Sequence, residues 1–223
     1  MNILALDAST EYCSVALWAD GAVSERVAAA GQAHSEQLLD LVDAVLADGG
    51  LQLCSLDGIA YGQGPGSFTG LRVACAVTQG LAFPSGIPVA GIGTLHAMAV
   101  SCGADRVLCC LDARMGEIYH AAYVRDGDGY AEFSAPRVCA PEEAPLPTGN
   151  GWTACGSGFA EYGDVLRQRY ADVLLAVAED VHPRAGGMAR LAAPLFAQGR
   201  GAPAEMAVPV YIRDKVALKT AER

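Results

Sequence analysis

The fold is decided by Ile3–Leu17, a stretch that reads ILALDASTEYCSVAL. Its apolar start, Ile3–Asp7, predicts a short strand that ends in an aspartate. The polar residues 9–11 predict a turn, and Cys13–Trp18 predicts a second strand that returns beside the first as a hairpin. Asp20 and the glycine after it predict a further turn into a third strand over 23–28.

The same pattern recurs at an offset of 105 residues, where Leu111-Asp112-Ala113 repeats Leu6-Asp7-Ala8. A turn and a second apolar strand, Ile118–Val124, follow this copy as well. Two hairpins in an alanine-rich chain can share three residues by chance. The position of each copy at the start of one half of the chain, with the same hairpin around it, makes duplication an equal alternative to chance.

Helices and strands are predicted along the rest of the chain from the spacing of apolar residues. Helices are expected at 35–48, from the glycine-rich loop to about 83, at 160–170 and at 185–198, with strands at 56–61 and 88–92. Pro194 predicts a kink or an early end in the last of these helices. Residues 126–150 are expected to be mostly surface hairpin and loop.

Composition indicates a folded protein of one or two modest domains. The 223 residues are 52% hydrophobic and 18% charged, which excludes a disordered chain. The chain has 25 acidic and 15 basic residues and a net charge of −10. Because nucleic-acid phosphates are also negative, we do not expect the chain to bind nucleic acid by itself.

Neither export nor metal binding is expected. The N-terminus has no basic segment, and the charge-free residues 73–104 are broken by glycines and prolines, so no membrane span is predicted. The 8 cysteines include no C-x-x-C pair and the 4 histidines no H-x-x-x-H pair, so we expect free thiols, no metal and a cytoplasmic location.

A glycine-rich loop occupies Gly62–Arg72, GQGPGSFTGLR, between a predicted strand and a predicted helix. Such a loop leaves backbone amides free at a helix N-terminus, which suits an anion, but it matches neither a Walker A motif, nor G-x-G-x-x-G, nor G-x-S-x-G. A tight connection in which Ser67 or Thr69 caps the helix explains it on chemistry alone. The residues assigned to this structural loop are Gly64, Pro65, Gly66, Ser67, Thr69 and Gly70.

This loop closely resembles the signature of the TsaB (YeaZ) family. The N-terminal stretch quoted above resembles that family too, as do HSEQLL at His34–Leu39, LDARMGEIY at Leu111–Tyr119 and PVYIR at Pro209–Arg213. These matches follow one another in the same order over nearly the whole chain, which makes the resemblance specific.

The resemblance implies an α/β, two-lobed, actin-like (ASKHA) ATPase fold with duplicated lobes and a degenerate active site. The expected N-terminal lobe is 1–104, with 209–223 packing back on it, and the expected C-terminal lobe is 105–208. In working members of that superfamily the first hairpin cradles phosphate. Here Asp7, Thr10, Gly156 and Gly158 would form the remnant cleft, holding at most a weak adenine or guanine nucleotide.

The family's role implies a non-catalytic subunit. Its partners are the catalytic TsaD and the ATPase TsaE, and together they transfer a threonylcarbamoyl group to the adenosine next to the anticodon of tRNAs that read codons beginning with A. TsaD binds metal through an H-x-x-x-H pair, whereas this chain has His34 followed by Leu38. This departure agrees with a non-catalytic partner. Because the chain is acidic, contact with tRNA is expected only through the complex, and a homodimer is expected in isolation.

The resemblance also assigns the partner interface to the first helix and to the helix after the glycine-rich loop. The residues assigned to it are His34, Leu38, Leu39, Val42, Leu46, Leu71, Ala74 and Cys75. Leu39 and Leu46 lie at one edge of an apolar arc of about 160° and are predicted to be interface rather than core.

Two enzymatic alternatives remain. An actin-like small-molecule kinase or nucleotide-binding protein would use Asp7, Thr10 and 156–158 as phosphate and nucleotide contacts. A peptidase, an older label of the family, lacks metal ligands and a Ser–His pair at a recognisable spacing.

Overall fold

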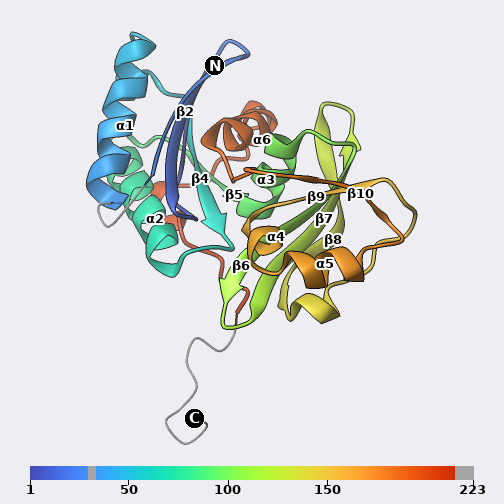
Figure 1. Ribbon diagram of the computed structural model, residues 1–223. Coiled ribbons are helices and arrows are strands. Elements are labelled where there is room, and N and C mark those ends of the chain that lie inside the picture. The colour runs from blue at the N-terminus through green and yellow to red at the C-terminus, as the bar shows by residue number, and fades with distance from the viewer. Residues whose placement is uncertain (30–33, 214–223) are drawn as a thin grey trace, which may run out of the picture.

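Two five-stranded sheets lie side by side in the computed structural model, which describes residues 1–29 and 34–213 (Figure 1). The first sheet has the order β3-β2-β1-β4-β5. Its strands are β1 (Asn2–Asp7), β2 (Tyr12–Ala19), β3 (Ala22–Ala29), β4 (Gly58–Gly64) and β5 (Val89–Gly93). The first three strands pair antiparallel, while β4 and β5 run parallel to β1.

The second sheet repeats this topology, with the order β10-β9-β6-β7-β8. Its strands are β6 (Arg106–Arg114), β7 (Glu117–Asp126), β8 (Gly129–Cys139), β9 (Trp152–Cys155) and β10 (Leu174–Ala178). Strand β6 takes the place of β1, with an antiparallel hairpin on one side and parallel strands on the other. The predicted two-lobed α/β fold with duplicated halves is confirmed.

The first sheet is covered on both faces because its central strands are apolar on both sides. In β1, Leu4 and Leu6 face a cluster that contains the helices α1 (His34–Asp48) and α2 (Phe68–Ala82). The alternate residues Ile3 and Ala5 face α6 (Ala185–Ala197). This period of two is that of a strand buried on both faces.

The second sheet is covered in the same way. The helix α3 (Thr94–Cys102) packs on the face that presents Cys109 and Leu111. The short helices α4 (Ser157–Glu161) and α5 (Gly163–Arg169) contribute to the cluster on the opposite face. Single 3-10 turns lie at Leu53–Ser55, Phe83–Ser85, Pro141–Glu143 and Ala204–Met206.

Helices α3 and α6 lie between the two sheets and pack against each other (Figure 1). A Cβ added at Gly187 of α6 would lie 2.9 Å from the carbonyl oxygen of Ala97 in α3, so the glycine permits the close approach. A boundary at 104/105 separates the two sheets but not their helices. Helix α3, assigned to the first lobe, covers the second sheet, and α6, assigned to the second lobe, covers the first.

Other expectations need correction in the second half of the chain. The hairpin expected within 126–150 is formed by β8 pairing with β7, but the strand β10 was not predicted. The single helix expected at 160–170 is two short ones. Helix α6 continues past Pro194, whose missing N–H frees the carbonyl of Arg190, an exposed residue.

The glycine-rich loop rests on the turn between β1 and β2. The amide of Ser67 donates to the carbonyl oxygen of Ser9 at 2.7 Å, and the Ser67 hydroxyl caps α2 by accepting from the amide of Gly70 at 3.3 Å. A Cβ at Gly70 would lie 1.7 Å from the carbonyl oxygen of Ala8, and one at Gly66 would lie 2.4 Å from that of Ser9. The motif therefore serves close backbone contact, with Ser67 rather than Thr69 as the cap.

We predict that Gly70→Ala lowers the free energy of unfolding by roughly 2 kcal/mol or more, because the new methyl group forces α2 away from Ala8. The control is Gly80→Ala in the same helix, where nothing lies within 4 Å of the added Cβ. This control is expected to gain up to about 1 kcal/mol from helix propensity. Urea denaturation measures both, and equal effects of the two substitutions would contradict the prediction.

Candidate functional site

Asp7 ends β1 and is buried, with 1% of its surface exposed. One carboxylate oxygen accepts hydrogen bonds from the hydroxyl of Ser9 at 2.8 Å and from its amide at 3.2 Å. The other oxygen has no partner among the described residues and faces Gly62, where an added Cβ would lie 2.0 Å away. Burial raises the pKa of Asp7 to about 6, the hydrogen bonds from Ser9 oppose the rise, and Glu25 adds to it.

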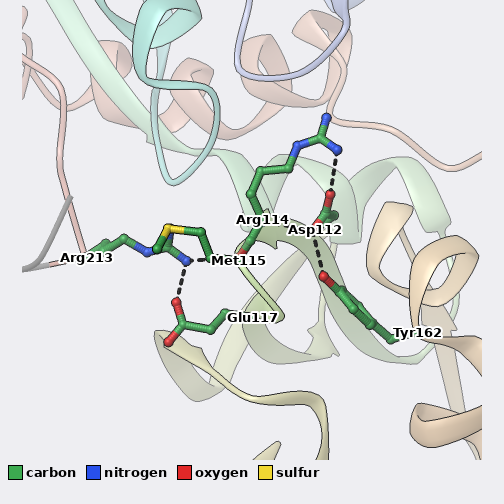
Figure 2. A network of polar contacts seen from close by, with 6 residues as sticks. All are labelled: Asp112, Arg114, Met115, Glu117, Tyr162 and Arg213. Carbon is green, nitrogen blue, oxygen red and sulfur yellow. Dashed lines mark hydrogen bonds and ion pairs between the residues drawn. The ribbon is translucent and has the colours of Figure 1, made fainter. Parts of the chain in front are cut away.

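Asp112 lies two residues before the end of β6 (Arg106–Arg114) and is the counterpart of Asp7 in the second lobe. Its carboxylate accepts from the amide of Arg114 at 2.8 Å, just as Asp7 accepts from the amide two residues on. It also accepts from the hydroxyl of Tyr162 at 3.3 Å and pairs with the guanidinium of Arg114 at 3.0 Å (Figure 2). The two halves thus share an aspartate that folds the turn after its strand.

Two cavities open near the β1–β2 turn. The larger, of about 520 Å³, lies between the glycine-rich loop, the β6–β7 turn and residues 210–213, and Thr10 lines it. The second, of about 440 Å³, is lined by Gly156 and by residues 177–182. Glu11 lines both, and it faces His182 at 4.0 Å.

These residues do not fit a magnesium nucleotide held through Asp7. Neither cavity is lined by Asp7 or Gly158, and the carboxylate of Asp7 is already bound by Ser9. The expected set of four cleft residues is therefore divided, with Thr10 and Gly156 at separate cavities and the other two inside the protein.

The outer surface of α1 and α2 differs from the predicted interface. Six of the eight assigned residues are buried in the chain's own core: Leu38 0%, Val42 2%, Leu46 8%, Leu71 1%, Ala74 0% and Cys75 5% exposed. The prediction that these six residues lie on a surface open to a partner was wrong. Leu39 is 44% exposed, and the side chain of His34 lies outside the described residues.

Leu46 is buried because the C-terminal end of α1 lies against the first sheet. Its side chain belongs to the cluster that holds Leu17 and Leu56, although it is only about 20° from Leu39 around the helix. A helical wheel treats both ends of a helix alike and does not resolve this difference. The exposed face of the helix pair contains Leu39 in α1 and Ala76 and Gly80 in α2.

Comparisons of sequence and of structure with known proteins point to the same family. A curated protein of Escherichia coli, "tRNA threonylcarbamoyladenosine biosynthesis protein TsaB", is 38% identical over 98% of this chain and 97% of its own length. Its namesake in Haemophilus influenzae is 35% identical over 98% of this chain and 96% of its own length. The chain belongs to the TsaB family.

Solved structures agree with this TsaB-family assignment. "YeaZ from Pseudomonas aeruginosa" superposes with a TM-score of 0.86 at 35% identity, covering 94% of this chain and 99% of that one. A second crystal structure, of a protein described as similar to peptidase YEAZ from Pseudomonas aeruginosa, has a TM-score of 0.87 at 35% identity, covering 95% and 99%.

A broader family model, "TsaD: tRNA N6-adenosine threonylcarbamoyltransferase", matches residues 26–220. Leu38, which follows His34 by four residues, is fully buried in this TsaB-family chain. Within the described residues, no three histidine, cysteine, aspartate or glutamate side chains gather as a candidate metal site.

Sequence reasoning missed the charged and aromatic residues around the larger cavity. Arg114 and Tyr119 come from the second lobe, and Tyr211 and Arg213 from the end of the described chain. All four lie inside the family-like segments 111–119 and 209–213, so the signal was present in the sequence. Nothing in either segment alone indicates that the two meet.

We predict that Asp7→Asn stabilises the protein at neutral pH but not in acid. Folding raises the pKa of the Asp7 carboxyl from 3.8 to about 6. The raised pKa does not lower the free energy of unfolding below pH 3.8, and it lowers it by the full amount above pH 6. The gain of Asp7→Asn over wild type should therefore rise by about 3 kcal/mol between pH 4 and 7, measured by urea denaturation.

The quantity to plot against pH is the difference in free energy of unfolding between Asp7→Asn and the wild type. This is because His120 makes the stability of both proteins rise with pH, opposite to the effect of Asp7. Burial lowers the pKa of His120 to about 4, so its contribution to stability is lost as pH falls from 6.5 toward that value. Both proteins share this slope and it cancels. A gain that stays flat with pH would contradict the buried, proton-binding Asp7.

Proposed function

We propose that this chain is a non-catalytic subunit of the system that attaches a threonylcarbamoyl group to the adenosine next to the anticodon of tRNAs that read codons beginning with A. Membership of the TsaB family supports a part in threonylcarbamoyladenosine biosynthesis. The non-catalytic role is supported by one observation above all, the burial of Asp7 behind Ser9 and away from both cavities.

The partners in this proposal are the catalytic TsaD and the ATPase TsaE. The relationship to TsaD is supported by the family model that spans most of the chain. With a net charge of −10, the chain reaches tRNA only through the complex. It holds no tightly bound nucleotide, since Asp7 offers no oxygen to a cavity.

The proposed site of action is the cytoplasm. No helix in residues 1–29 and 34–213 is long and apolar enough to cross a membrane.

We place the contact with TsaD on the exposed face of α1 and α2. The two helices pack against each other on the outer side of the first sheet, so their exposed sides form one surface (Figure 1). Leu39 offers an apolar side chain there, while Ala76 and the open space around Gly80 allow a helix of the partner to approach closely. The same surface supports a homodimer when the partner is absent.

Reconstitution tests the function. Purified TsaD, TsaE, ATP, the threonylcarbamoyl donor and unmodified tRNA are expected to give threonylcarbamoyladenosine over many turnovers only when this chain is added. Unchanged modification without the chain would overturn the proposal. Phosphorylation of a small acceptor by the chain alone with ATP would favour the kinase instead.

Leu39→Glu tests the surface. The side chain is 44% exposed, so the melting temperature should change by no more than about 2 °C. Binding to TsaD, measured by calorimetry, should weaken at least about tenfold, because the apolar side chain is lost and a further negative charge joins the exposed Glu36, Asp40 and Asp43.

The matched control is Leu175→Glu, since Leu175 is 73% exposed on β10 in the second lobe. This control is expected to bind TsaD like the wild type. Binding that survives Leu39→Glu, or that Leu175→Glu weakens equally, would reject the α1–α2 surface.

A further inference from the structure

The segment 206–211 is fastened to the first lobe by two side chains that bind its backbone. The hydroxyl of Tyr61 accepts from the amide of Val208 at 3.1 Å and lies 3.3 Å from the carbonyl oxygen of Met206. The side-chain amide of Gln79 donates to the carbonyl oxygen of Ala207 at 3.0 Å. Because Tyr61 is in β4 and Gln79 in α2, the segment follows the junction of sheet and helix.

The next residues stay on the same lobe. The amide of Val210 donates to the carbonyl oxygen of Gln63 at 2.7 Å. Arg72 donates to the hydroxyl of Tyr211 at 3.0 Å, and the ring of Tyr211 lies 5.4 Å from that of Phe68. Strand β4 and helix α2 thus hold the segment as far as Tyr211.

Arg213 then crosses to the second lobe. Its guanidinium donates to the carboxylate of Glu117 and, at 3.4 Å, to the carbonyl oxygen of Arg114 (Figure 2). It also lies 5.9 Å from the centre of the Tyr119 ring. The side chain of Arg213 is 15% exposed and that of Glu117 is 39% exposed, so the arginine end of the pair is largely removed from solvent while the carboxylate end reaches it.

The turn that Arg213 grips is conformationally costly. Arg114, Met115 and Gly116 have φ angles of 62°, 59° and 77°, all in the left-handed region. Met115 and Gly116 form a two-residue loop between the paired residues Arg114 and Glu117, and such a loop favours asparagine, aspartate or glycine. Gly116 fits this preference, whereas Met115 and the preceding Arg114 adopt a positive φ that such side chains disfavour. Asp112 binds the turn on its own lobe, and Arg213 binds it from the other.

We propose that residues 206–213 are an interlobe strap and that the Arg213–Glu117 pair is its latch. Among the described residues, the lobes meet where α3 packs on α6, at this strap, and just before α6, where the ring of His182 lies 4.4 Å from that of Tyr12. The cavity of about 520 Å³ has the strap as one wall. With the pair made, the β6–β7 turn is held toward the β1–β2 turn. With the pair broken, the second sheet pivots at α3 and α6, and the cavity opens.

Hydrogen exchange read by mass spectrometry tests the latch in the full chain. Arg213→Gln and Glu117→Gln each remove the charge pair, and both should speed exchange about tenfold in two peptides, 111–120 and 8–12. Peptides from α6 should not change. The double variant Arg213→Glu with Glu117→Arg restores the pair and should return both peptides to within about threefold of the wild type.

Arg125→Gln is the control. It breaks the 2.9 Å ion pair between Arg125 and Asp105, which lies within the second lobe and does not involve the strap. It should leave both peptides unchanged. Acceleration confined to 111–120 would mean that Arg213 only pins the turn, and this would overturn the latch. Unchanged exchange in both single variants, or equal acceleration across the chain, would overturn it as well.

Discussion

The close contact between the glycine-rich loop and the β1–β2 turn is the constraint on which the rest of the first lobe depends. Gly70 lies so near the carbonyl oxygen of Ala8 that no side chain fits between them. This contact sets where α2 begins, and α1 then packs beside α2 over the apolar face of the sheet. The strap follows the same junction, because Tyr61 and Gln79 on either side of it bind its backbone.

The same contact bears on function. In a hairpin that cradles phosphate, the turn after the first strand has to offer backbone amides and a carboxylate to a ligand. Here the carboxylate of Asp7 accepts a hydrogen bond from the hydroxyl of Ser9, and the amide of Ser67 donates to the carbonyl oxygen of Ser9. The turn therefore serves as a support for α2. This arrangement supports the non-catalytic subunit role that we propose for the chain.

Local signals predicted the fold well and the surface poorly. Asp20 and Gly21 form the tight turn that their sequence indicates, with φ angles of 48° and 88°, because hairpin turns are set by the residues within them. The repeat of Leu6-Asp7-Ala8 at 111–113 indicated the duplicated lobes, because each copy lies in a strand and turn whose pattern is visible in the local sequence. The exchange of α3 and α6 between sheets, and the burial of Leu46 beside an exposed Leu39, depend on tertiary packing. So does the meeting of Arg213 with Glu117, residues 96 positions apart.

The most direct test of the account is a hydrogen-exchange footprint of this chain bound to purified TsaD. We expect slower exchange in α1 and α2, with β7 and β8 of the second lobe unchanged. Those strands form the opposite end of the second sheet from β10, so they report on the lobe that the proposed contact leaves free. Protection confined to the second lobe, with α1 and α2 exchanging as in the free chain, would contradict the account.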